Sequence, residues 1–342
     1  MSTPASLDLR PFTVGEILDR ALRIHRGNFR KLFIVMLAFQ LPVYVMTKSF
    51  EYFGYDYFPH FLRPGLLAVS PPRPDVTVRE FLWLLAAGTV FWAAMLAMHD
   101  LRLAATTVAG REAFLGQSVS VREALTRTVE RAGALLGTTA VQMILYVFLI
   151  GLAALPAAGL VAAAVLRTEG QALWLLGALF VLAVFEVPTV LWLMLRYSLV
   201  AQVVMLERVS FVRALRRSAE LMRGRASTNA SSKWTDNSML RASIVLAVTL
   251  AVNVAVASLM SVPHLLVNFA YGNNPLTPNA VDPLAVPAYA IIPIELADAA
   301  LESAVAPFWL LAMMVFYFDL RIRKEGFDLE VLAETLAKKP AA

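Results

Sequence analysis

The most unusual ionisable residue of this chain lies inside a long apolar stretch. Glu186 stands in the run F-E-V-P, two residues before Pro188. A carboxyl group at membrane depth is costly unless it is protonated or paired. Two roles stay open: it couples proton movement to transport, or, when protonated, it hydrogen-bonds backbone that Pro188 leaves free. Gln142 and Asn253 are the partners expected from their residue types.

A second candidate site is an acidic face near the C-terminal end of the chain. Glu295, Asp298 and Glu302 are spaced i, i+3 and i+7, which places them on one side of a helix. If that helix begins near residue 300, the first two carboxylates face water. If it begins near residue 290 and tilts inward, all three line a cavity that could hold a cation or protons. Both arrangements stay open.

Motifs for other chemistry are missing from the sequence. The chain has no Cys, which excludes disulfides and thiolate metal sites. The four His residues are scattered, and zinc-protease, P-loop and nucleophile-elbow motifs do not occur. We therefore expect a protein that is not an enzyme and that needs no cofactor and no metal ion.

The composition requires lipid as a solvent. Apolar residues make up 59% of the 342 residues and charged residues 16%, whereas soluble domains are about 45–50% apolar. The apolar runs predict six membrane-spanning helices, at about 32–48, 80–100, 138–166, 171–196, 241–268 and 300–320. His99, Asp100 and Arg102 are expected at the solvated end of the second of these spans.

Basic residues are distributed unevenly among the loops. Most of the 30 Lys and Arg residues lie in four alternate segments, namely 10–31, 101–135, 206–241 and 321–342. By the positive-inside rule these segments are cytoplasmic. The pattern predicts a multi-pass protein of a bacterial inner membrane with both termini in the cytoplasm.

A short amphipathic motif occurs three times, each time before an apolar stretch. The copies begin at Thr13, Ser120 and Ser210, with a Leu five residues on and an Arg seven residues on. The first two add a glutamate that completes a capping box. Each copy either lies in the lipid headgroup plane or packs against the ends of the spans. The basic residues expected to face lipid phosphates are Arg20, Arg23, Arg127, Arg213, Arg216 and Arg217.

The recurrence of this motif predicts three parallel repeats. They would cover residues 13–100, 120–205 and 210–320, each with one interfacial helix and two spans. Residues 321–342 would form a cytoplasmic tail. The predicted fold is therefore all-α: a single polytopic membrane bundle of about six transmembrane helices, with three amphipathic interfacial helices on its cytoplasmic side.

Three segments carry a resemblance to a known family. The run E-R-V-S-F-V-R-A-L-R-R-S-A-E-L-M-R-G-R at 207–225 is the longest, and the segments at 13–29 and 317–330 accompany it. Together they resemble bacterial glycerophosphoryl diester phosphodiesterase membrane-domain proteins and the related YciC-like proteins. The resemblance implies a helical membrane fold without an assigned activity. The soluble phosphodiesterase barrel of the family name has no counterpart in the sequence.

These observations favour a non-enzymatic membrane component, either a scaffold or a transporter-like protein that handles amphiphilic or lipid substrates in the bacterial envelope. An alternative is a proton- or cation-coupled secondary transporter that uses Glu186. A third is a membrane enzyme that acts on lipid headgroups. The expected partners are membrane lipids, with anionic headgroups among them, and other membrane proteins. Nucleic acid is not expected, because the basic residues alternate with lipid-seeking ones.

Overall fold

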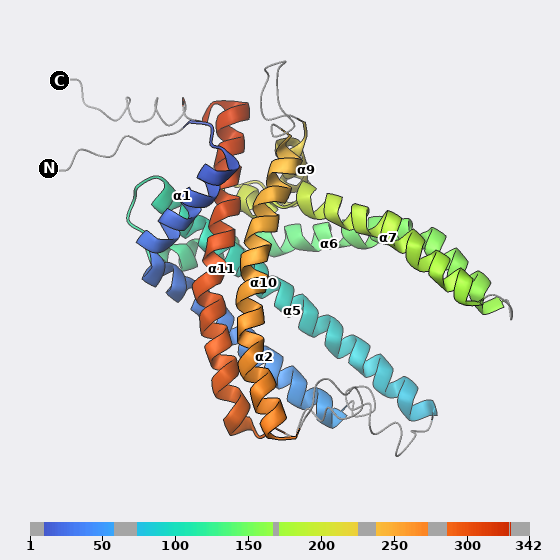
Figure 1. Cartoon of the computed structure of the whole chain (residues 1–342). Helices are drawn as coiled ribbons and strands as arrows, with labels where there is room; N and C mark the ends of the chain where they lie inside the picture. The colour runs from blue at the N-terminus through green and yellow to red at the C-terminus, as the bar shows by residue number, and fades with distance from the viewer. Residues whose placement is uncertain are drawn as a thin grey trace, which may run out of the picture. The chain divides into compact units, whose positions relative to one another are not determined.

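The computed structural model describes residues 10–57, 74–166, 171–224, 237–272, 286–327 and 329, and its regular elements there are helices (Figure 1). The predicted all-α class is confirmed. In chain order the helices are α1 (Val14–Gly27), α2 (Phe29–Tyr57), α5 (Pro74–Phe114), α6 (Val121–Leu166), α7 (Gln171–Arg196), α8 (Val200–Gln202), the π-helix η1 (Val203–Glu207), α9 (Phe211–Met222), α10 (Ser238–Ala270) and α11 (Ala288–Glu325).

Six of the described helices are long and apolar enough to cross a membrane. They are α2, α5, α6, the helical stretch from α7 to η1, α10 and α11, in the order that the sequence predicted, which fits a multi-pass membrane protein. Several are longer than predicted. For example, α5 continues to Phe114, so His99, Asp100 and Arg102 lie within the helix instead of at its solvated end.

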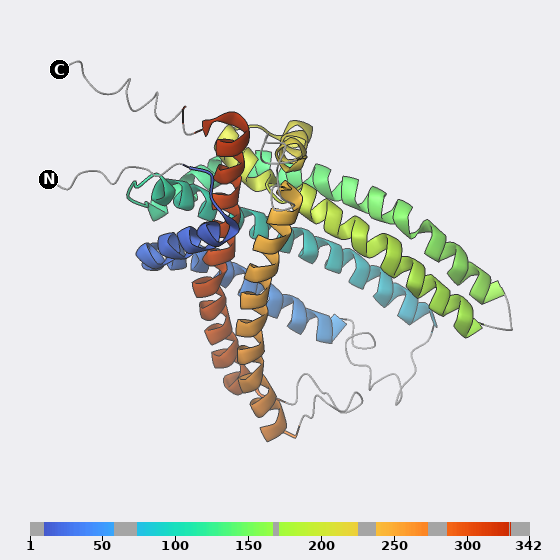
Figure 2. The same cartoon turned by 45° about the horizontal axis from the view of Figure 1, so that its top comes forward.

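The chain divides into two compact units. The first holds residues 1–20, 128–246 and 312–342, and the second holds 21–127 and 247–311. In the first, α6 and α7 run side by side in both views (Figures 1 and 2). In the second, α2 packs against α5. The predicted repeats have other boundaries than these units, and their equivalence stays a prediction.

The three motif copies bury the same positions. The residues at the fifth and ninth places of each copy are all buried, whereas the shared leucine is buried in the third copy and half-buried in the other two. The buried face of each copy is therefore marked by the residue directly before the shared leucine. The buried pairs are Ile17 and Ala21, Ala124 and Thr128, and Ala214 and Ser218.

The first copy forms the predicted capping box. The amide of Thr13 donates to Glu16 Oε2 at 2.7 Å, and the amide of Glu16 donates to Thr13 Oγ1 at 3.3 Å. These bonds and the neighbouring Arg10 lower the pKa of Glu16 to about 2. In the second copy the amide of Ser120 donates to Glu112 Oε2 at 3.0 Å. A glutamate from the preceding helix thus fills the predicted role of Glu123.

The second copy also differs in continuity. Residues 121–166 form one unbroken helix, α6, so the second amphipathic segment is the first part of a long apolar helix. Between residues 128 and 138 the chain offers no Pro and no cluster of turn residues to end a helix. The first and third copies are helices of their own, α1 and α9.

The third copy is positioned by α6. The amide of Phe211 donates to Thr138 Oγ1 at 2.8 Å, where Ser210 makes no side-chain cap. The Phe211 ring lies against Gly137, where a Cβ would be 2.7 Å from its Cε1 atom. Gly133 has open space around it. Of these two glycines of α6, Gly137 alone is closely approached, and the group that approaches it is an aromatic ring.

A buried ionic cluster in the first unit is centred on Asp319, in the segment 317–330 that carried part of the family resemblance. Asp319 is fully buried and accepts hydrogen bonds from the amide of Phe12 at 2.7 Å and from Arg323 at 3.0 Å. It also pairs with Arg241 at 2.9 Å. Both arginines donate to the carbonyl of Phe12 as well, at 2.7 and 2.6 Å. One carboxylate thus ties the chain before α1 to α10 and α11.

Candidate functional site

On the acidic face of α11, ionisable side chains from several helices of the second unit meet. Because α11 begins at Ala288, Glu295, Asp298 and Glu302 share one side of a continuous helix in the second unit. The start of this helix matches the second arrangement that the spacing allowed, but not all three carboxylates line a cavity. Asp298 and Glu302 line a pocket of about 440 Å³, and Glu295 lies outside its lining.

Glu302 is held by two helices. Its Oε1 atom pairs with Arg102 of α5 at 2.8 Å, and its Oε2 atom accepts a hydrogen bond from Gln40 of α2 at 2.7 Å. Arg102 also donates to Gln40 Oε1 at 3.2 Å and lies 3.1 Å from His99 Nδ1. The Arg102 side chain is only 16% exposed. A buried guanidinium therefore fixes the glutamate at the edge of the pocket.

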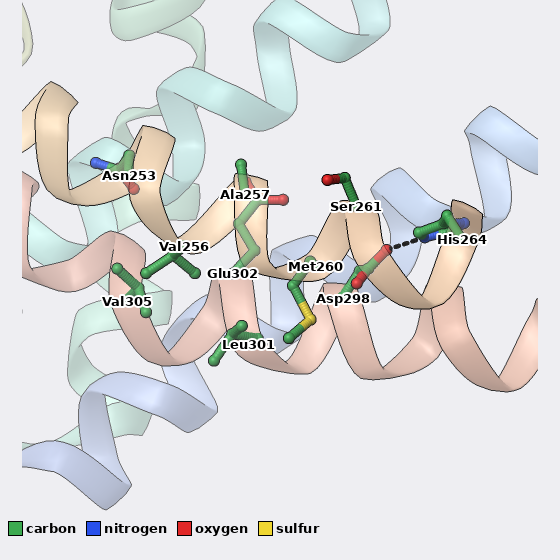
Figure 3. Close-up of a pocket in the computed structure, with 10 residues that line it drawn as sticks. All are labelled: Asn253, Val256, Ala257, Met260, Ser261, His264, Asp298, Leu301, Glu302 and Val305. Carbon is green, nitrogen blue, oxygen red and sulfur yellow. Dashed lines mark hydrogen bonds and ion pairs between the residues drawn. The ribbon is translucent and has the colours of Figure 1, made fainter. Parts of the chain in front are cut away.

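Asp298 pairs with a histidine across the pocket. His264 Nε2 of α10 lies 2.5 Å from Asp298 Oδ2, and Figure 3 shows the two side chains pointing toward one another. The other oxygen, Asp298 Oδ1, is buried and has no hydrogen-bond partner among the described residues. Such an acceptor is costly to leave unsatisfied. A donor group of a bound molecule would satisfy it.

Glu295 is neutralised by α2. Lys48 Nζ lies 2.5 Å from Glu295 Oε1, and the Tyr44 hydroxyl donates to Glu295 Oε2 at 3.2 Å. Lys48 also pairs with Glu51 at 2.5 Å. The three carboxylates of α11 thus have basic partners on three different helices, α2, α5 and α10. Removing one partner would leave an uncompensated charge in a poorly hydrated place.

The pocket itself is amphipathic. It lies between α10 and α11, which run side by side (Figures 1 and 2), and its ten lining residues are shown in Figure 3. Half of them are polar and half are apolar. The polar ones are Asn253, Ser261, His264, Asp298 and Glu302, and the apolar ones are Val256, Ala257, Met260, Leu301 and Val305.

The predicted site at Glu186 is not assembled by hydrogen bonds. Both carboxylate oxygens of Glu186 are buried, and neither has a partner among the residues that the structure describes. Gln142 donates to the Tyr146 hydroxyl at 2.8 Å, and Asn253 donates to the Thr249 carbonyl at 2.9 Å. Each amide thus forms a hydrogen bond within its own helix, one turn away, in place of the expected bond to Glu186. The residue types alone did not reveal these alternative partners.

The predicted lipid-facing arginines fall into two groups. Arg23 and Arg213 are exposed, and Arg216 is exposed and lines a second pocket in the first unit. The others have partners within the protein. Arg20 stacks on the Phe12 ring at 5.0 Å, and Arg127 pairs with Glu123.

Arg217 is the clearest departure from a lipid-facing role. It pairs with Glu207 at 2.7 Å and with Glu325 at 2.5 Å. Burial disfavours its charge, but the hydrogen bonds to these carboxylates outweigh that and raise the pKa of Arg217. The side chain therefore links η1, α9 and α11 instead of facing lipid phosphates.

Sequence reasoning missed the basic residues of the α11 face. Lys48, Arg102 and His264 belong to separate helices and show no shared spacing. The signal that could have found them is their position inside or beside apolar spans, because ionisable groups at membrane depth pair with one another. Within the described ranges no group of three or more His, Asp or Glu side chains could hold a metal ion.

Comparison of the chain with protein families, with characterised proteins and with solved structures gave no match.

Proposed function

We propose that this protein is a non-enzymatic membrane protein that takes up an amphiphilic, lipid-like molecule in the pocket between α10 and α11. The observation that carries the proposal is the make-up of that pocket. At about 440 Å³ it falls within the range of small-molecule sites, roughly 300–1,000 Å³. Its walls belong to helices that are apolar enough to cross a membrane.

The lining suits a molecule with one polar end. Val256, Leu301 and Val305 offer apolar contact, whereas Asp298 Oδ1 is an acceptor without a hydrogen-bond donor among the described residues. Glu302 is already bound by Arg102 and Gln40 and is preorganised without a ligand. An amphiphile with a donor in its headgroup, such as an amine or a hydroxyl, matches these groups.

The test is to fill the pocket. The full chain is reconstituted in liposomes that contain phosphatidylethanolamine with a photoactivatable acyl chain, and cross-links to α10 and α11 are mapped. Val256→Trp should suppress them, because Val256 lines the pocket. Val254→Trp is the matched control, because Val254 is 55% exposed and outside the lining. Unchanged cross-linking in Val256→Trp would refute the proposal.

A second candidate function is proton-linked transport, with the coupling group at Asp298 instead of Glu186. The short His264–Asp298 contact and the unsatisfied Asp298 oxygen favour it. Proteoliposomes with an internal pH dye test this candidate. Asp298→Asn should abolish the proton uptake that the dye reports, and Asn253→Ala should retain this uptake.

The predicted location and topology form part of the proposal. We infer a bacterial inner membrane and cytoplasmic termini from the basic segments, and relatedness to the glycerophosphoryl diester phosphodiesterase membrane-domain group from the three quoted motifs. Membrane lipids and other membrane proteins are the proposed partners. A periplasm-active reporter fused after Ala342 should give no signal, and a strong signal would reverse the orientation.

A further inference from the structure

A second pocket, of about 420 Å³, lies in the first unit at the end of α7. Its polar lining differs from that of the α10–α11 pocket because it is mainly basic. Arg196 of α7, Arg216 of α9 and Arg223, the residue after α9, line it, with Glu220 as the acidic member. Three positive charges against one negative charge leave an excess of positive charge, so the pocket favours an anion.

Arg196 is positioned to use its N–H groups on a ligand. It is the last residue of α7, and its guanidinium stacks on the Trp192 ring at 4.7 Å and on the Tyr197 ring at 6.0 Å. Stacking occupies the faces of the guanidinium and leaves its edges for hydrogen bonding. Arg196 Nε is buried and has no hydrogen-bond partner among the described residues. An oxyanion in the pocket would satisfy it.

Arg216 lies in α9 and Arg223 directly follows its last residue, and both side chains line the pocket. Both are exposed. They contrast with Arg217, which lies one residue on from Arg216 and is bound to Glu207 and Glu325. Arg217 thus links parts of the protein, whereas Arg216 and Arg223 line the pocket.

The surroundings of the pocket identify its occupant. Trp192 and Tyr197 stand at the end of an apolar helix, where aromatic residues mark the boundary between lipid and water. Leu145 and Val212 supply apolar lining beside the arginines. Basic pockets between helices at this boundary suit phosphate-bearing lipid headgroups. We propose that an anionic glycerophospholipid binds here, with its phosphate at Arg196, Arg216 and Arg223 and its acyl chains along the apolar side.

The test compares lipids of different charge. The purified full chain is titrated with phosphatidylglycerol in mixed micelles, with phosphatidylcholine as the zwitterionic reference. Each basic residue near an anionic lipid surface contributes roughly fivefold in affinity, so Arg216→Gln with Arg223→Gln should weaken phosphatidylglycerol binding about 25-fold. Both side chains are exposed, so the variant should fold, and size-exclusion chromatography checks this. Phosphatidylcholine binding should not change.

The control is Arg213→Gln, which removes one positive charge from an exposed position on α9 outside the pocket. It should weaken phosphatidylglycerol binding less than fivefold. A loss of fivefold or more in the control, which is the same loss per charge removed as in the double variant, would show diffuse surface attraction and overturn the site. An unchanged affinity in the double variant would also overturn it. Soluble glycerol 3-phosphate should not compete at the lipid concentration used. If it competes, the occupant is a free phosphate ester and the lipid assignment is wrong.

Discussion

Replacing Asp319 with asparagine tests whether the buried ionic cluster holds the first unit together. The substitution preserves shape and leaves an oxygen that can still accept from the amide of Phe12. It removes the negative charge that Arg241 and Arg323 share. The new amide group is a donor, and it would face guanidinium groups that are donors as well.

The magnitude follows from burial. The Asp319 side chain is 0% exposed, that of Arg241 is 3% and that of Arg323 is 15%. Breaking a buried ion pair by removing one partner costs about 3–5 kcal/mol, because the other charge stays buried without compensation. Arg241 and Arg323 keep their bonds to the Phe12 carbonyl, which satisfies donors but not charge. We therefore expect a loss of about 3–5 kcal/mol, or roughly two to three and a half orders of magnitude in the unfolding equilibrium constant.

The assay is reversible unfolding of the purified protein in mixed detergent micelles. Glu325→Gln serves as the control, because it removes the same charge from the same helix at a side chain that is 26% exposed. That substitution should cost about 1 kcal/mol or less. A loss below 1 kcal/mol for Asp319→Asn, or equal losses in the two variants, would refute the view that the cluster is a buried electrostatic anchor.

Three further predictions concern other parts of the chain. Gly133→Ala, which meets open space within α6, should stabilise by about 0.5–1 kcal/mol in the same assay, and Gly137→Ala should gain less, because its Cβ would crowd the Phe211 ring. Glu186→Leu should leave stability unchanged or raise it, since no described hydrogen bond is lost, and a marked loss would reveal a partner. Burial lowers the pKa of His25 more than its backbone contact raises it. The stability contribution of neutral His25 should therefore be fully present above about pH 6.5 and should decrease as the pH falls toward the folded-state pKa of His25. Melting temperatures measured over this pH range should show the decrease. The variant His25→Phe should not show it.

Hydropathy alone predicted the six long helices, because their apolar length is a local property. The ends were harder to predict. His99, Asp100 and Arg102 resembled the end of a span, yet α5 continues to Phe114. Arg102 is accommodated within that helix by a carboxylate of α11. A boundary that depends on a partner 200 residues away is not visible in a local window.

The sequence predicted the acidic residues of the candidate site but not their basic partners. Glu295, Asp298 and Glu302 share a helical face, and that spacing is readable from the sequence. Their partners lie on α2, α5 and α10, and only the packing of these helices places Lys48 or His264 beside α11. The Glu186 hypothesis had less support, because it rested on a single residue whose partners were chosen by residue type alone.

The contrast between Glu186 and the α11 face bears on where proton chemistry can occur. A carboxyl group that exchanges protons needs its charged form to be accessible, and at membrane depth that requires a neighbouring charge or a polar cavity. Asp298 has such a cavity, since it lines the pocket together with polar residues, and His264 lies 2.5 Å from it. Glu186 has neither a hydrogen bond nor an ion pair among the described residues, and it lines neither of the two pockets described above. Any coupling reaction of this protein should therefore respond to substitution of Asp298 and not of Glu186.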